Sequence, residues 1–394
     1  MFSDAKKKTL VVKPMAKVPP FTISPPSKVS SEWGQASPPL PFAISSLPAL
    51  TIGGWLVSVG VSCLLAVVAL LVCLGFGTEP IPFSRIWSIL VGTLPGAGSI
   101  RSGADPTTVI LLQVRLPRLL LAFFVGGSLA MVGVALQALL RNPLADPFII
   151  GISSGAALGA AIALLFGVGI SILSVSALPV CAFAGALLSL VIMYRISSVG
   201  FGFSIYTLLL AGVVLNAIFS AFIMFLTSVA DPNRAFGMYA WLMGSLTGPD
   251  FHTLGVLALY LGMGLGILAT QAQSLNLLTL GEETARSLGV EVERVKKLVF
   301  VAAALLTGAV VSFSGIIGFV GLIVPHAVRL VVSADHRLLL PAAGFVGGMF
   351  LMLADTVART ALSPSEFPVG VVTALVGGPV FLYLLTTRNL RVGI

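Results

Sequence analysis

Charged residues are scarce in this chain of 394 residues, where lysine, arginine, aspartate and glutamate together make up 9%. Soluble domains carry about 25%. Hydrophobic residues make up 57%, and the mean hydropathy is +1.08. The core of a soluble protein cannot absorb this much apolar sequence, so we predict a membrane protein whose solvent is lipid.

Motifs that would carry catalysis or bind cofactors are also missing. The sequence contains no G-x-x-x-x-G-K-[ST] phosphate loop, so it does not bind ATP in that way. The three cysteines lie in apolar runs without metal-ligand or disulfide spacing, and the three histidines are scattered, which favours packing or capping roles. The net charge of +8 comes without basic clusters interleaved with aromatics, which argues against nucleic-acid binding.

Acidic residues are almost absent from the apolar segments. Asp355 is the main exception, and Arg359 follows it on the same helical face, so we predict an ion pair. Ion-driven carriers usually need intramembrane acids or ion sites. Their scarcity indicates that energy for any transport comes from a partner protein.

Ten apolar segments follow one another along the chain. They cover residues 53–76, 108–140, 148–168, 173–194, 205–228, 251–270, 298–318, 320–333, 338–361 and 368–386. The eighth is short and contains Pro325, which predicts a half-helix packed inside protein. We therefore predict an all-α polytopic membrane protein with about ten transmembrane helices.

Residues 1–50 differ from the rest, because they are rich in proline, serine and lysine. This composition predicts a disordered tail. Lysines before the first span place the tail in the cytoplasm, and an even number of spans returns the C-terminus to the same side. Residues 51–394 then form the transmembrane domain.

One charged stretch, 281–297 (GEETARSLGVEVERVKK), separates two apolar segments on the predicted cytoplasmic side. Its pattern predicts a short helix, a break at Gly289 and a second short helix. A solvated loop and a docking site for a partner protein both remain open.

Several motifs occur in a joint order that resembles the FecCD-type permeases, the membrane subunits of type II ABC importers. The motifs run from Arg115-Leu116-Pro117-Arg118 to Gly378-Pro379, and the resemblance covers about residues 53–386. Between them lie Gln137, Asn142-Pro143-Leu144-Ala145, Ser154-Gly155-Ala156, Gly281-Glu282, Gly318-Phe319-Val320-Gly321-Leu322, Pro325-His326, Asp335-His336-Arg337 and Pro368-Val369-Gly370.

The resemblance implies a homodimer of permease subunits in the bacterial inner (cytoplasmic) membrane. Its partners would be two cytoplasmic ATPase subunits, which bind the ATP and magnesium, and one periplasmic substrate-binding protein. The chain itself would be no enzyme and would hold no cofactor or metal.

Matching of motifs also implies three sites. Docking of the binding protein would involve Arg115, Arg118 and Arg359. Coupling to the ATPases would involve Gly281, Glu282, Glu283, Ala285, Arg286, Leu288 and Gly289. The translocation path and its gate would involve Ser204, Ile205, Tyr206, Thr207, Asn216, Ser220, Met224, Thr373 and Tyr383. Relatives commonly carry small hydroxyl residues at the gate, whereas Ile205 and Tyr206 are bulky.

The expected function is import of a large metal chelate from periplasm to cytoplasm. Haem and ferric siderophores are the leading substrates, and cobalamin is the runner-up. A stand-alone channel or ion-coupled carrier is the alternative from another class. A purely structural scaffold is disfavoured, because outer arginines, a gate-like segment and a charged inner loop occur together.

Overall fold

The computed structural model describes residues 52–77, 79–92, 105–167, 171–172, 175–198, 203–246, 250–363 and 365–392. The predicted tail, residues 1–50, lies outside the described residues. The described part is helical apart from two short antiparallel strands, β1 (Ser171–Ile172) and β2 (Val175–Ser176). Seven of its helices are long and apolar enough to cross a membrane, and the predicted all-α fold is confirmed.

Each of the ten predicted segments corresponds to a helix or a continuous run of helix. These are α1 (Ile52–Gly75), the run of α3 (Pro106–Val109), η1 (Ile110–Arg115) and α4 (Leu116–Leu139), α5 (Ile152–Phe166), α6 (Ala177–Ser197), α7 (Ile205–Val229), α9 (Phe251–Thr270), α12 (Val292–Ser314), α13 (Val320–Val331), α14 (His336–Thr360) and α15 (Val369–Val392). Sequence analysis missed three further helices and a 3₁₀ turn: α2 (Phe83–Gly92), α8 (Pro232–Leu242), α10 (Ala272–Thr279) and η2 (Pro147–Ile150).

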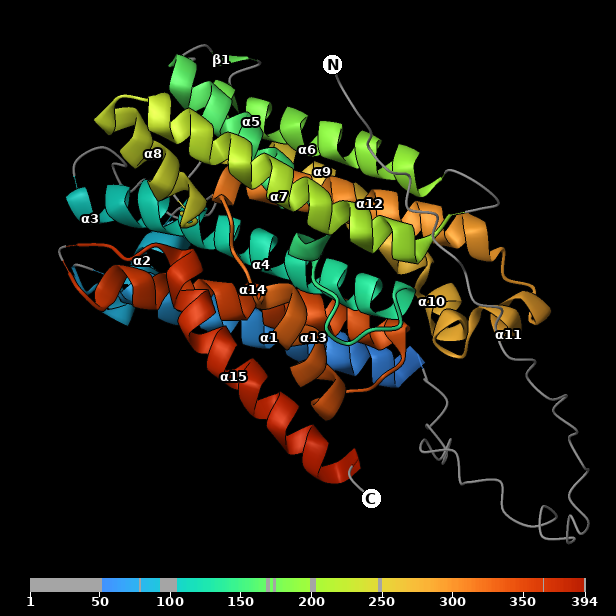
Figure 1. Cartoon of the computed structure of the whole chain (residues 1–394). Helices are drawn as coiled ribbons and strands as arrows, with labels where there is room; N and C mark the ends of the chain where they lie inside the picture. The colour runs from blue at the N-terminus through green and yellow to red at the C-terminus, as the bar shows by residue number, and fades with distance from the viewer. Residues whose placement is uncertain are drawn as a thin grey trace, which may run out of the picture. The chain divides into compact units, whose positions relative to one another are not determined.

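The run from α3 to α4 is the central helix of the described bundle. It contains 34 residues, and at 1.5 Å per residue it reaches about 50 Å, longer than the hydrocarbon core. The π-helical segment η1 lies just before Pro117, which lacks the N–H that a regular helix would use. α4 packs along α14 and α13, which also contact each other, and along α12 (Figure 1).

Small residues let these helices approach closely. A Cβ atom on Gly126 would lie 2.3 Å from the Gly347 carbonyl oxygen, and one on Gly133 would lie 1.9 Å from the Gly321 carbonyl oxygen. Neither position has room for a larger residue. The glycines therefore form close-packing surfaces at these contacts.

The bundle has two distinct ends. α10 and α11 (Glu282–Ser287) lie at one, and α2, α3 and α8 lie at the other (Figure 1). α14 runs from the first of these ends, where α10 binds its first turn, toward the second. The Asn276 side chain donates to Asp335 Oδ1 at 2.7 Å and lies 2.6 Å from His336 Nδ1. His336 is buried in this contact and therefore packs between the two helices, whereas the cap of α14 is Asp335.

Arg359 lies in the last turn of α14, 23 residues beyond His336, which corresponds to about 35 Å along the helix. This length matches the thickness of a bilayer core. We call the end that carries Arg359 the arginine end, and the end that carries α10 and α11 the α11 end.

Candidate functional site

The three predicted docking arginines come together at the arginine end. Arg115, Arg118 and Arg359 line one small cavity of about 100 Å³, which Gly77, Glu79, Ile110, Val114 and Glu366 complete. Arg115 and Arg118 come from the central helix run, and Arg359 comes from α14. We call this site the arginine pocket.

Asp355 holds two of these arginines. Its carboxylate is fully buried and accepts from Arg359 Nε at 2.9 Å, as sequence analysis predicted. The other carboxylate oxygen accepts from Arg118 Nε, also at 2.9 Å. Arg118 Nη1 also donates to Glu366 Oε2 at 2.9 Å. Asp355 and Glu366 therefore fix the guanidinium group of Arg118 from two sides.

Exposure differs among the three arginines. Arg115 is buried, and its guanidinium group donates to the carbonyl oxygens of Leu74, at 2.9 Å, and of Glu79. It therefore ties the segment after α1 to the central helix. Arg359 is also buried, whereas 12% of the Arg118 side chain is exposed. Of the three, Arg118 is the one whose side chain reaches the surface most.

The charged stretch at the α11 end begins with the predicted short helix. α11 runs from Glu282 to Ser287, and the chain breaks at Gly289, whose φ is +87°. Glycine adopts this conformation without the strain that a side chain would add. Ala285 is buried beneath the helix, whereas the Leu288 side chain is exposed, with a relative accessibility of 58%.

The predicted second short helix is wrong. Residues 292–297 are instead the first turns of the long helix α12, which begins six residues before the predicted span. Val292, Val295 and Val299 are all buried and continue one apolar stripe into the membrane-spanning part. This stripe keeps the chain helical from residue 292 into the span that was predicted to begin at residue 298.

Asp146 lies between α4 and η2, close to the α11 end. Its side chain accepts from the Phe148 N–H at 2.8 Å. Burial raises the pKa of this carboxyl to about 6, although the Phe148 bond acts in the opposite direction. Because the folded pKa is raised, this group favours the fold below the unfolded pKa near 4, and the contribution is lost as the pH rises through about 6.

The predicted gate residues form the beginning of α7. The Ser204 hydroxyl caps the helix by accepting from the Thr207 N–H at 3.2 Å, and the Thr207 hydroxyl donates to it at 2.9 Å. Tyr206 has a relative accessibility of 85%. The gate segment is thus a capped helix start with one aromatic side chain projecting from it.

The predicted path residues divide into two groups. Ser220, Met224 and Tyr383 are exposed on α7 and α15. Asn216 is half-buried, and its amide donates to the Phe148 carbonyl at 3.3 Å. Thr373 is buried, and its hydroxyl donates to the Gly370 carbonyl at 3.0 Å. Large apolar side chains are also exposed on α7 and α15, including Leu210, Val213, Phe222, Phe225, Leu375 and Leu382.

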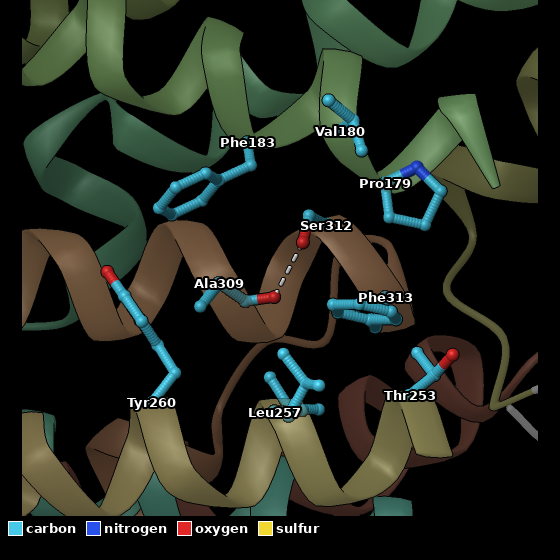
Figure 2. A pocket seen from close by; sticks show the side chains of 10 residues that line it. Pro179, Val180, Phe183, Thr253, Leu257, Tyr260, Ala309, Ser312 and Phe313 are labelled. Carbon is cyan, nitrogen blue, oxygen red and sulfur yellow. Dashed lines mark hydrogen bonds between the residues drawn. The ribbon is translucent and has the colours of Figure 1, made fainter. Parts of the chain in front are cut away.

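A separate apolar pocket of about 190 Å³ lies between α6, α9 and α12. Figure 2 shows Phe183 from α6 above Tyr260 and Leu257 from α9, with Ser312 from α12 between them. The Ser312 hydroxyl donates to the Ala309 carbonyl at 2.7 Å and is therefore satisfied within its own helix. None of the predicted path or gate residues lines this pocket.

Within the described ranges, no three histidine, cysteine or carboxylate side chains gather closely enough to hold a metal ion.

Known proteins resemble the chain over most of its length. A model of the FecCD transport family matches residues 64–387. A cobalamin import system permease protein of Halobacterium salinarum is 45% identical over 300 residues, which cover 76% of this chain and 79% of that protein. A hemin transport system permease protein of Yersinia pestis is 44% identical over 283 residues, which cover 71% and 84%.

A solved structure agrees with these matches. It is described as the inward-facing conformation of a transporter assigned to the metal-chelate type of ABC transporters. The TM-score is 0.70 at 32% identity, and the match covers 84% of this chain and 99% of that one. Family, sequence and fold therefore agree, and the chain belongs to the FecCD transport family as the permease subunit of an ABC transporter, a complex whose ATP hydrolysis takes place in separate subunits.

Proposed function

We propose that this permease imports a large metal chelate across the cytoplasmic membrane, driven by partner ATPases. The observation that carries the proposal is the separation of two polar sites by one membrane thickness. The arginine pocket lies at one end of α14 and α11 lies beyond the other, about 35 Å away. An importer needs such a pair, because it receives cargo on one face and energy on the other.

Binding-protein docking belongs to the arginine end in this proposal. Arg118 offers a partly exposed guanidinium group to acidic residues of a partner, while Arg115 and Arg359 support the pocket from inside the subunit. Charged groups at the rim of an interface mainly set the association rate and its salt dependence.

Docking of the ATPase belongs to α11. Leu288 is an exposed apolar side chain beside the charged residues Glu283 and Arg286. An exposed apolar side chain surrounded by charged residues is more stable in a cleft of a partner protein than in water. The segment that presents Leu288 is shaped by Gly281, Glu282, Ala285 and Gly289.

A homodimer completes the proposal. α7 and α15 both carry faces on which large apolar side chains are exposed within the single subunit. Two copies that bring these faces together around an axis would enclose a path lined by Ser220, Met224 and Tyr383. Ser204 to Thr207 would close that path at the α11 end, and both chain termini would lie in the cytoplasm.

Macrocyclic chelates are the favoured substrates. Two relatives of nearly equal identity are named for cobalamin and for hemin, and neither is named for a siderophore. The exposed path residues are neutral, which suits a bulky cargo that must not bind tightly to the walls. We therefore place haem and cobalamin ahead of ferric siderophores.

The stand-alone carrier is disfavoured by the state of Asp355. This buried acid is held by Arg118 and Arg359 at 2.9 Å each, so it is not available to bind a coupling ion. An ion-coupled carrier needs an acid or polar site that exchanges its partner during transport.

The test is reconstitution of the chain with its ATPase partner and its binding protein in lipid vesicles. We expect ATP-dependent uptake of haem or cobalamin, and Leu288→Asp should abolish both uptake and co-purification of the ATPase, because an apolar contact of this kind contributes about 2 kcal/mol or more. Leu288→Met keeps the apolar side chain and serves as the control. Uptake by the isolated chain without an ATPase would instead support the carrier.

A further inference from the structure

One buried lysine joins α11 to the start of the long helix behind it. Lys296 on α12 is only 5% exposed. Its ammonium group donates to Glu282 Oε2 at 2.8 Å and to Glu293 Oε1 at 3.4 Å. Lysine is rarely buried unless it is paired, and here both partners are carboxylates. Glu282 is the first residue of α11, so the lysine fixes the position of that helix.

The second carboxylate continues the connection to the gate. Glu293 Oε2 accepts from the backbone N–H of Phe203 at 2.8 Å, although the two residues are 90 positions apart. Phe203 directly precedes Ser204, the residue that caps α7. A single carboxylate therefore contacts the buried lysine with one oxygen and the beginning of the gate segment with the other.

Ring packing supports the same junction. The Phe203 side chain is 3% exposed, and its ring lies 5.4 Å from that of Phe300 on α12 and 6.2 Å from that of Tyr194 on α6. The gate segment is thus anchored to α12 twice, through a backbone hydrogen bond and through an aromatic contact. Arg286 adds a weaker contact, at 3.9 Å from Glu282 and 3.8 Å from Glu293.

We infer that Glu282, Lys296 and Glu293 form an ionic relay that transmits displacement of α11 to the N-terminus of α7. The inference rests on the proposed function for its two endpoints, ATPase docking at α11 and gating at 204–207. Lys296 and Glu293 are positioning residues in this relay, since neither contacts cargo. When α11 moves, the Glu282 carboxylate moves with it. Lys296 is bound to both carboxylates and therefore displaces Glu293, which in turn displaces the Phe203 amide that is hydrogen-bonded to it.

The relay gives the coupling a contiguous physical route. Coupling between sites needs elements whose arrangement both sites influence. Here the side chains of Glu282, Lys296 and Glu293 contact one another in sequence, and one hydrogen bond joins Glu293 to the Phe203 backbone amide. These contacts form a continuous route from the first residue of α11 to the residue before the gate.

The principal variant is Lys296→Met in the full complex with ATPase and binding protein. We expect the ATPase to remain bound and to hydrolyse ATP, while the number of cargo molecules transported per ATP falls about fivefold or more, the scale of a typical coupling between sites. Lys296→Arg should restore most of the ratio. Arg195→Gln removes a positive charge from the exposed last turn of α6 and should leave the ratio unchanged.

Hydrogen exchange of the Phe203 amide gives a readout that a general loss of stability would not reproduce. In the wild type, exchange of the Phe203 amide should change when the ATPase binds nucleotide. Lys296→Met should remove that dependence, and Glu293→Ala, which deletes the acceptor, should raise exchange of this amide about tenfold even in the isolated chain. If Lys296→Met misfolds, the double variant Lys296→Met/Glu293→Gln removes both charges of that pair and carries the same expectation.

A wild-type transport ratio in Lys296→Met, or unchanged Phe203 exchange in Glu293→Ala, would overturn the relay. Failure of the proposed function gives a different result. In that case the wild type does not bind an ATPase at all, and the nucleotide dependence of exchange is absent before any substitution is made.

Discussion

Asp355 shows how a single carboxylate organises the arginine pocket. Burying an isolated charge is very unfavourable, and a buried ion pair is stable only if its geometry satisfies both partners. The Asp355 oxygens accept separately from Arg118 and Arg359, at 2.9 Å each. Removing the carboxylate leaves Arg359 buried without its charged partner.

We therefore expect Asp355→Asn to destabilise the subunit by about 3–5 kcal/mol, because it breaks a buried pair without removing the arginines. The measurement is the apparent melting temperature of the purified protein in detergent. Val357→Ala changes an exposed side chain on the same helix and should have little effect. Equal melting temperatures for the two variants would show that the pair does not stabilise the fold.

Glu366 tunes the arginine that reaches the surface. Its side chain is 48% exposed and holds Arg118 at 2.9 Å, so it competes with any acidic residue of a docking partner. Glu366→Gln should raise the association rate of the binding protein about two- to tenfold at low salt, and high salt should remove the difference. Stopped-flow binding measures this rate.

Glu366→Asp keeps the negative charge and should behave like the wild type. Slower association of Glu366→Gln would mean that Glu366 itself contacts the partner, which contradicts the competition described above.

At the scale of elements, α13 is a 12-residue helix that depends on its neighbours. Its N-cap is Phe319, whose φ of +68° lies in the left-handed region that side chains disfavour. Gly133 on α4 lets the Gly321 carbonyl approach, and Arg329 Nη1 donates to Gln137 Oε1 at 2.6 Å. Too short to cross a bilayer alone, α13 is held against the central helix by these contacts.

Gly133→Ala is expected to displace α13, because the new Cβ would lie 1.9 Å from the Gly321 carbonyl oxygen. We expect a loss of about 1–3 kcal/mol, typical of overpacking, and a marked loss of transport. The readouts are the apparent melting temperature and vesicle uptake. Gly266→Ala on α9, where nothing lies within 4 Å of the added atom, is the matched control and should preserve both. A Gly133→Ala protein that melts and transports like the control would show that the contact yields easily.

The whole subunit combines two polar ends with apolar sides. Large apolar side chains are exposed on α7 and α15 and also on α1 and α9. The proposed dimer places α7 and α15 at the interface between copies and α1 and α9 against lipid.

Cysteine cross-linking makes that distinction. In a Cys63→Ser/Cys181→Ser background, Tyr206→Cys should cross-link two copies in at least one nucleotide state, and the link should block uptake, because a bulky chelate cannot pass a tethered gate. Leu259 on α9 has a relative accessibility of 69%, and Leu259→Cys should not cross-link. If residues 203–208 yield no cross-link in any state while Leu259→Cys does, the dimer axis lies along α9 instead.

The sequence by itself determined the features that depend on local pattern. Apolar runs of bilayer length predicted the spanning helices, and the four-residue spacing predicted the Asp355–Arg359 pair. The order of motifs predicted the family. The break at Gly289 was also predicted, because glycine adopts a positive φ without the strain that a side chain would add. One local signal was overlooked: Asp231 before Pro232 is a helix start, and it begins α8.

Tertiary structure decided the contacts between distant segments, because side chains that are far apart in the chain meet only after the helices pack. Arg118 donates a hydrogen bond to Asp355, which is 237 positions away in the chain. Glu293 accepts one from the Phe203 amide, which is 90 positions away. The same packing buries Thr373 and the ammonium group of Lys296, which residue type alone would leave exposed. The periodicity of the sequence does not encode these pairings. They depend on which face of each helix is covered by the neighbouring helices that pack closely against it.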